Sequence, residues 1–268
     1  MAGSSPQLMR YPLTAYTILA CAIAWMFMIA QALGAGIEAG QFPLGPIIAA
    51  ALVSASLGRP GLRQWGRRLA TLRAAPGWYA IAIAAPIAIL VAAVLANAAF
   101  GAPLPTAAQL GAGPALGGEF LGVLIAIGIG EEAGWTAFAA PLLLDRHRFV
   151  RAWLVLGGIR SLWHLPLMLQ GDLSWTLGIG GNFAFQLLVL WLYRRTGVWF
   201  LAALWHAALN TVGGSFLFQM VEGADQGRLG LLMVAGYWLA AIAVLWLDRR
   251  RLGLSPAAAA PGSIGAPA

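Results

Sequence analysis

Residues 120–144 read FLGVLIAIGIGEEAGWTAFAAPLLL, an apolar run whose only charges are Glu131 and Glu132. A run of this length and hydrophobicity is typical of a helix that crosses a membrane. A carboxylate near the centre of such a helix costs about 2.5–3.5 kcal/mol on insertion scales, and this run holds two. We therefore expect both carboxylates to have partners, and we expect a functional site around them.

The composition of the whole chain indicates a membrane protein. Of its 268 residues, 60% are hydrophobic and 9% are charged, whereas soluble domains carry about 25% charged residues. The net charge of +7 comes from arginine alone, since the chain has no lysine. We attribute this charge to membrane topology rather than to nucleic-acid binding, and we expect no nucleic-acid partner.

The chain has eight apolar segments, and the connections between them are alternately rich and poor in arginine. These segments are residues 13–35, 44–58, 77–100, 120–144, 152–169, 176–193, 197–220 and 229–247, of which the second is short for a span. Fourteen of the sixteen arginines lie on alternate connections: Arg10, Arg59, Arg63, Arg67, Arg68, Arg73, Arg146, Arg148, Arg151, Arg194, Arg195, Arg249, Arg250 and Arg251. The intervening connections hold one, Arg228. The positive-inside rule then predicts an all-α, polytopic membrane helix bundle of about eight transmembrane helices, with both termini in the cytoplasm.

We expect one transmembrane domain over residues 1–252, with an uncleaved signal anchor as its first span. The proline- and alanine-rich tail, residues 253–268, is predicted to be disordered. Residues 62–73 combine four arginines with apolar residues at helical spacing, which indicates either an amphipathic helix at the cytoplasmic surface or a basic loop. The lysine-free, alanine-, glycine- and arginine-rich composition suggests a multi-pass protein of a bacterial plasma membrane.

Three apolar segments carry polar side chains at similar depth. They are Glu131 and Glu132, then Arg160 and His164, then His206 and Asn210. In the second and third pairs the two residues are four apart, so each pair shares one helix face. At about 1.5 Å per residue, all three sets lie near the middle of the bilayer. The sequence therefore predicts one shared site, with Trp135 and Trp163 as candidates for its walls.

Two kinds of hydrolytic chemistry suit this set of residues. In the first, Glu131 acts as a base that activates water, a histidine orients that water, and His206 and Asn210 donate hydrogen bonds to the oxyanion. That is the outline of peptide-bond hydrolysis without a nucleophilic serine or cysteine. In the second, His164, His206 and Glu131 bind zinc and the other glutamate is the base. The sequence leaves both open, although the usual H-E-x-x-H spacing is absent.

These motifs resemble those of the CPBP intramembrane protease family, which includes the type II CAAX prenyl endopeptidases and bacteriocin-immunity membrane proteins. The resemblance rests on EEAGWTAFAAP at 131–141, WHLP at 163–166 and HAALN at 206–210, and it covers roughly residues 118–215. The family pattern is EExxxR, FxxxH and HxxxN or HxxxB, in the same order. The resemblance implies a helical membrane bundle with a lipid-accessible cavity.

The resemblance also implies roles for individual residues. It makes Glu131 the water-activating base and Glu132 its neighbour, and it places His164 in the second motif. His206 and Asn210 match the third motif, where they stabilise the oxyanion.

Two positions depart from the family pattern. Thr136 stands where the family has arginine, and Arg160 stands where it has phenylalanine. An arginine absent from one helix and present on a facing one suggests an exchange of position. We therefore expect the Arg160 guanidinium to take the place of the family arginine and to pair with Glu132.

The sequence supports an intramembrane glutamate-dependent endopeptidase whose substrate is a peptide or a membrane protein, with or without a lipid anchor, within the lipid bilayer. A second hypothesis is a non-catalytic protein of the same fold that acts in bacteriocin self-immunity or binds membrane proteins, and the two departures favour it. A third is a transporter that relays protons through buried Glu and His. Inverted repeats and broken helices would mark such a transporter, and the sequence shows neither clearly.

Overall fold

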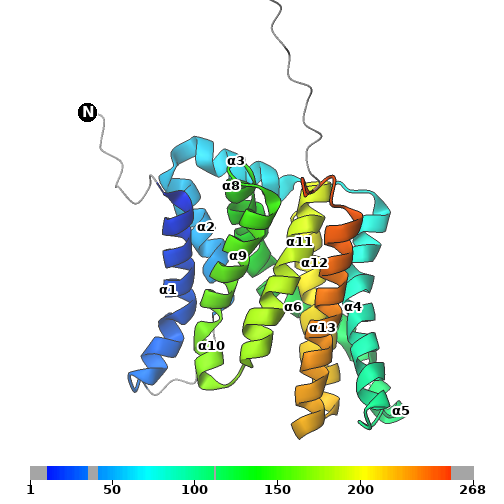
Figure 1. Ribbon diagram of the computed structural model, residues 1–268. Coiled ribbons are helices and arrows are strands. Elements are labelled where there is room, and N and C mark those ends of the chain that lie inside the picture. The colour runs from blue at the N-terminus through cyan, green and yellow to red at the C-terminus, as the bar shows by residue number, and fades with distance from the viewer. Residues whose placement is uncertain (1–10, 36–41, 112, 255–268) are drawn as a thin grey trace, which may run out of the picture.

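The structure is a computed structural model that describes residues 11–35, 42–111 and 113–254. The described residues form helices and no β-strand, which confirms the all-α prediction (Figure 1). Six stretches of helix are long and apolar enough to cross a membrane. They are α1 (Pro12–Ala32), α4 (Pro76–Ala99), the run from α6 to α8 (Leu116–Leu144), η5 with α11 (Thr176–Thr196), the run from α12 to η7 (Phe200–Met220) and α13 (Gly223–Leu247).

The other two predicted spans are shorter helices. Residues 44–58 contain α2 (Gly45–Ser56), and residues 152–169 divide into α9 (Phe149–Trp163) and α10 (Leu165–Gln170). The division falls at His164 because Pro166, in the first turn of α10, has no backbone N–H to donate to the preceding turn, which interrupts the hydrogen bonding of the helix. A straight helix needs about 20 residues to cross the bilayer. The structure therefore shows six spans by length, and the number eight and the orientation remain predictions.

The arginine-bearing connections gather at one end of the bundle. Figure 1 shows α3 (Gly58–Ala70) lying across the end where α8, α11 and α13 finish, with α5 (Ala107–Leu110) and α10 at the opposite end. Of the two expectations for residues 62–73, the helix is confirmed for residues up to Ala70, and no residue of α3 is buried. The indole of Trp65 fastens α3 to the bundle by donating to the carbonyl oxygen of Ala133 at 3.0 Å. Within the predicted tail, residues 255–268 lie outside the described residues, as does Arg10.

In the part of the chain that the structure describes, four π-helical segments interrupt the helices of the bundle interior. They are η3 (Leu124–Ile129), η4 (Trp135–Ala139), η5 (Thr176–Gly181) and η6 (Leu209–Gly214). The first two flank α7 (Gly130–Gly134), the short α-helical segment that carries both glutamates. Single π turns inside α-helices occur frequently at functional sites.

Glycines let α2 approach the glutamate-bearing helix closely. A Cβ on Gly134 would lie 2.5 Å from the carbonyl oxygen of Pro46, and one on Gly130 would lie 2.7 Å from Leu44 Cδ2. This contact uses the small-xxx-small spacing of the two glycines. On another face of the same helix run, a Cβ on Gly128 would lie 2.7 Å from the carbonyl oxygen of Ala203. The segment that holds the two acids is thus enclosed by backbone on two sides.

Candidate active site

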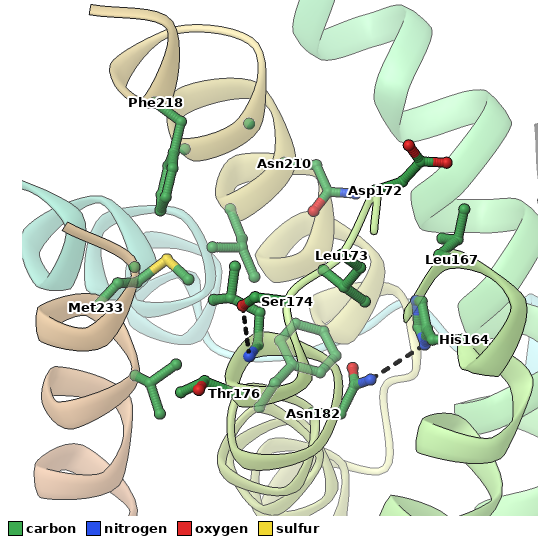
Figure 2. Close-up of a pocket in the computed structure, with 18 of the residues that line it drawn as sticks. His164, Leu167, Asp172, Leu173, Ser174, Thr176, Asn182, Asn210, Phe218 and Met233 are labelled. Atoms are coloured by element: carbon green, nitrogen blue, oxygen red, sulfur yellow. Dashed lines mark hydrogen bonds between the residues drawn. The ribbon is translucent and has the colours of Figure 1, made fainter. Parts of the chain in front are cut away.

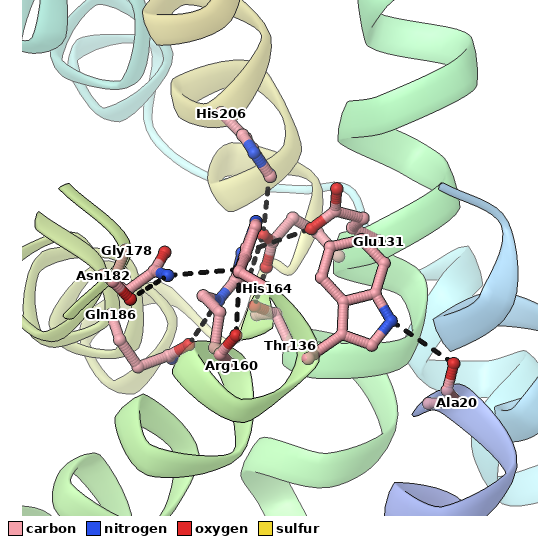
Figure 3. Close-up of polar contacts among 11 residues, drawn as sticks. Ala20, Glu131, Thr136, Arg160, His164, Gly178, Asn182, Gln186 and His206 are labelled. Atoms are coloured by element: carbon pink, nitrogen blue, oxygen red, sulfur yellow. Dashed lines mark hydrogen bonds and ion pairs between the residues drawn. The ribbon is translucent and has the colours of Figure 1, made fainter. Parts of the chain in front are cut away.

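Glu132 is fully buried and all its bonds are made within the protein. Its Oε1 accepts hydrogen bonds from Arg160 Nη2 at 2.7 Å and from His206 Nδ1 at 3.0 Å. Its Oε2 accepts one from Thr136 Oγ1 at 2.6 Å (Figure 3). Three donors from three helical segments therefore hold this carboxylate, and it does not line the cavity described below.

Glu131 stands beside Glu132 in the chain but in a different environment. Its hydrogen bond within the described part of the chain is long, at 3.5 Å from Arg160 Nη1 to its Oε2. Its side chain is 5% exposed and lines the cavity. The two carboxylates thus differ, because Glu132 is saturated with donors while Glu131 can still accept a proton or a hydrogen bond.

Arg160 forms the ion pair with Glu132 that the sequence predicted. It is 1% exposed, and its Nε also donates to Gln186 Oε1 at 3.0 Å. The guanidinium carbon lies 4.9 Å from the centre of the Phe185 ring and 5.5 Å from that of the Trp135 ring, within the range of cation–π attraction. A buried charge is tolerable only when it is paired and hydrogen-bonded, and Arg160 meets both conditions.

The third motif brings His206 and Asn210 to the same cavity. His206 lies on α12 (Phe200–Ala208). Its Nδ1 donates a hydrogen bond to Glu132, so in the neutral ring Nε2 carries no proton and is an acceptor. Asn210 lies in the π segment η6 and also lines the cavity. No hydrogen bond of its side-chain amide occurs with any described residue, so the amide is available to a substrate.

His164 lies at the break between α9 and α10 and is anchored differently. Its Nδ1 is 2.9 Å from the carbonyl oxygen of Arg160 and 3.1 Å from Asn182 Nδ2. With a proton on Nδ1 the ring donates to the carbonyl, and without one it accepts from Asn182. In either form Nε2 has no partner among the described residues. The wall beside His164 is Trp163, while Trp135 lies fully buried beneath Arg160.

A cavity of about 930 Å³ connects these residues with the end of the bundle that holds α10. Glu131, Arg160, His164, His206 and Asn210 lie at its inner end. Apolar side chains such as Leu167, Phe218 and Met233 and the polar Asp172 and Ser174 line the rest (Figure 2). The structure therefore gathers all the predicted site residues except Glu132 on one cavity, and Glu132 lies directly behind it.

Two polar partners of the site were not among the predicted residues. Gln186 accepts from Arg160, and Asn182 contacts His164 while also donating to the carbonyl oxygen of Gly178 at 2.8 Å. Both belong to the sixth apolar segment, four residues apart, and so share one helix face. This is the same spacing that identified the polar residues on the fifth and seventh segments, and it could have identified these two.

A metal ion does not fit the bonds made in this site. Among the described residues, the possible ligand atoms come together for Glu131, Glu132 and His206, within 4.8 Å of one another. This trio differs from the predicted zinc set of His164, His206 and Glu131. A dication here would share the Glu132 carboxylate with a guanidinium 2.7 Å away, and two cations that close repel strongly in a buried site. Arg160 already supplies the positive charge that a metal would bring.

Comparison with known families identifies the segment that builds this site. Residues 113–212 match the family described as type II CAAX prenyl endopeptidase Rce1-like. The match includes both glutamates, Arg160, both histidines and Asn210, and it agrees with the resemblance drawn from the motifs. A comparison with curated proteins finds no match. The segment that forms the buried site is therefore similar, over somewhat more than a third of the chain, to the Rce1-like family of type II CAAX prenyl endopeptidases, a family of intramembrane proteases.

Proposed function

We propose that the chain is an intramembrane endopeptidase in which Glu131 activates the water that attacks a peptide bond. The observation that carries the proposal is the difference between the two glutamates. Glu131 lines the cavity and has one long contact at 3.5 Å, whereas Glu132 is held by three donors and does not reach the cavity. A general base must be free to take a proton, and Glu131 is the carboxylate that is free.

The reaction follows from the positions of the side chains. Glu131 takes a proton from a water molecule, and the hydroxide attacks the carbonyl carbon of the peptide bond. Asn210 and a protonated histidine Nε2 stabilise the negative oxygen of the tetrahedral intermediate. When the carbon–nitrogen bond breaks, the proton on Glu131 passes to the leaving nitrogen, which gives a carboxylic acid and an amine. The acid then gives its proton to the amine, so the products are a carboxylate and an ammonium group.

Glu132 and Arg160 are positioning residues in this scheme. Glu132 fixes the tautomer and the orientation of the His206 ring through Nδ1. Arg160 compensates the charge of Glu132 and, at longer distance, that of Glu131. With the histidine protonated, the two carboxylates are balanced by the guanidinium and the imidazolium, so Glu131 stays ionised until it takes the proton of the water.

The substrate that this cavity favours is a peptide or the segment of a membrane protein. Its walls are largely apolar, and its inner end holds the reactive groups. A lipidated peptide is compatible with these walls.

The test is cleavage of a reporter peptide by the purified protein. We expect Glu131→Gln to lower turnover by about 10²–10⁴-fold, because glutamine cannot act as a base. The matched control is Glu119→Gln on α6 (Leu116–Val123), which makes the same change on the same helix run but outside the cavity. Equal turnover in the wild type and both variants would rule out the proposal and favour a non-catalytic protein.

Removal of metal tests the competing chemistry. With Arg160 bonded to Glu132, we expect a strong chelator to leave turnover unchanged. Loss of activity in chelator with recovery on addition of zinc would show that a metal displaces this ion pair, and it would establish the zinc mechanism instead.

A further inference from the structure

We propose that the cavity opens on the extracytoplasmic side of the membrane, so that the substrates are polypeptides exposed on that side. The identity of the occupant as a substrate rests on the proposed function. The direction of opening rests on geometry and charge alone, and it can be tested without any assay of cleavage.

The cavity extends from the glutamates toward one end of the bundle only. Its lining continues from His164 to residues 171–174 after α10, to Gln219 of η7 (Leu217–Met220) and to Gln226 in the first turns of α13. Figure 1 places α10 and the beginning of α13 at the end away from α3. Among the described residues, none of α3 and none of the arginine-bearing connections lines the cavity.

The opposite direction is closed by packed side chains. Behind Glu132 and Arg160 lie Thr136, Gln186 and Trp135, each no more than 1% exposed. From there to the α3 end, η4 and α8 (Ala140–Leu144) continue with buried residues such as Phe138 and Leu143. Among the described residues, packed side chains therefore separate the glutamates from the arginine-rich end.

The distribution of charge identifies the two sides. The arginines of α3, of the α8–α9 connection, of the end of α11 (Asn182–Thr196) and of residues 249–251 all lie at the closed end (Figure 1). At the open end, Arg228 is the one arginine among the described residues, and Asp225 neutralises it at 2.5 Å. Cytoplasmic connections of membrane proteins carry the excess of arginine. The closed end is then cytoplasmic and the open end extracytoplasmic.

The mouth of the cavity, defined here as Asp172, Ser174, Gln219 and Gln226, suits a polar peptide segment. Asp172 is exposed and has no ion pair with any described residue, so it adds a negative charge to the mouth. Apolar side chains such as Phe218 and Met233 line the same cavity (Figure 2). This combination of polar and apolar lining residues fits an extracytoplasmic polypeptide with an apolar stretch flanked by a polar or basic residue.

Thiol labelling in intact cells tests the direction. Cys21 is the only cysteine of the chain and is buried, so Cys21→Ala supplies a background for single-cysteine variants. Ser174→Cys reports on the mouth, and Arg250→Cys is the matched exposed position at the closed end. The measurement is the reaction with a membrane-impermeant maleimide in intact cells, relative to the same cells after permeabilisation.

We expect Ser174→Cys to react equally before and after permeabilisation, and Arg250→Cys to react only afterwards. The reverse pattern, or equal labelling of both positions in intact cells, would overturn the proposal. A Ser174→Cys variant that never reacts would show that the mouth is closed and would overturn it as well.

A second arm separates this inference from the proposed function. The reporter peptide is added to sealed right-side-out vesicles and to sealed inside-out vesicles, and cleavage is expected in the right-side-out vesicles only. Cleavage in inside-out vesicles alone would refute the direction while supporting the protease. Labelling as expected, with no cleavage in vesicles or in detergent, would refute the protease while supporting the direction.

Discussion

The helices that carry the site differ from those that surround it. In the run Leu116–Leu144, 72% of the most apolar stretch is buried inside the protein, whereas in α4 the share is 22%. The site runs are divided by π segments, while α1, α4 and α13 are single α-helices. The outer helices expose most of their surface to lipid, whereas the inner run packs mainly against other helices of the protein. Only the inner environment can supply ion pairs and hydrogen bonds to two carboxylates.

The largest expected effect follows from removing the central cation. Arg160→Leu leaves Glu132 buried beside Glu131 without its counter-ion, and breaking a buried pair in this way costs about 3–5 kcal/mol. We expect a lower thermal midpoint in detergent and a fraction of the protein that does not fold. The control is Arg195→Leu, which removes a more exposed partner of an ion pair at the arginine-rich end. Equal losses of stability in the two variants would show that burial does not distinguish the pairs.

The next effect compares two leucines. Leu187 on α11 is fully buried, while Leu239 on α13 is 69% exposed. We expect Leu187→Ala to cost about 2–5 kcal/mol, since it leaves a cavity in a packed interior. Leu239→Ala should leave the free energy of unfolding nearly unchanged, because lipid chains are as apolar as leucine. Chemical unfolding in detergent micelles measures both, and a large loss for Leu239→Ala would place that side chain in a protein contact.

A smaller effect tests the close approach of α2 to the glutamate-bearing helix. In Gly134→Ala the new methyl group meets the Pro46 backbone at 2.5 Å, and overpacking of this kind costs about 1–3 kcal/mol. Gly66→Ala on α3 is the matched control, since nothing lies within 4 Å of its Cβ. The control should gain about 0.5–1 kcal/mol from the higher helix propensity of alanine. A stable Gly134→Ala variant would mean that the two helices can move apart without loss.

The same contrast explains how much the sequence could predict. Outer spans such as α4 are plain apolar runs, and hydropathy located them. The ion pair of Arg160 with Glu132 was also predicted, because the arginine that the family pattern has at position 136 is absent and one stands at position 160 instead. The π segments were not predicted, since an extra residue per turn leaves the apolar pattern almost unchanged. Helical spacing places Thr136 one turn beyond Glu132. Which of the two carboxylates meets Arg160 and His206 is decided only by the packing of three helices.

The smallest expected effect concerns Asp248, which lies just beyond the end of α13 and forms an ion pair at the arginine-rich end. Asp248 Oδ2 accepts from Arg195 Nη1 at 2.7 Å and from Trp191 Nε1 at 2.9 Å. Burial by itself raises the pKa of Asp248, but the hydrogen bonds from Arg195 and Trp191 outweigh it and hold the pKa below its usual value. A carboxyl group with a lowered pKa in the folded protein adds stability above its unfolded pKa of about 4. That stability is lost as the pH falls through the folded pKa.

We therefore expect the wild type to lose about 1 kcal/mol or less from this pair between neutral and strongly acidic pH, as is usual for pairs near the surface. Asp248→Asn should lack this part of the pH dependence and should unfold at the same point as the wild type in acid. The measurement is the thermal midpoint of both proteins across that pH range in detergent. A constant difference between the two curves would mean that Asp248 acts through packing rather than charge. The pair would then resemble the neutral contacts of the outer helices and not the charged interior.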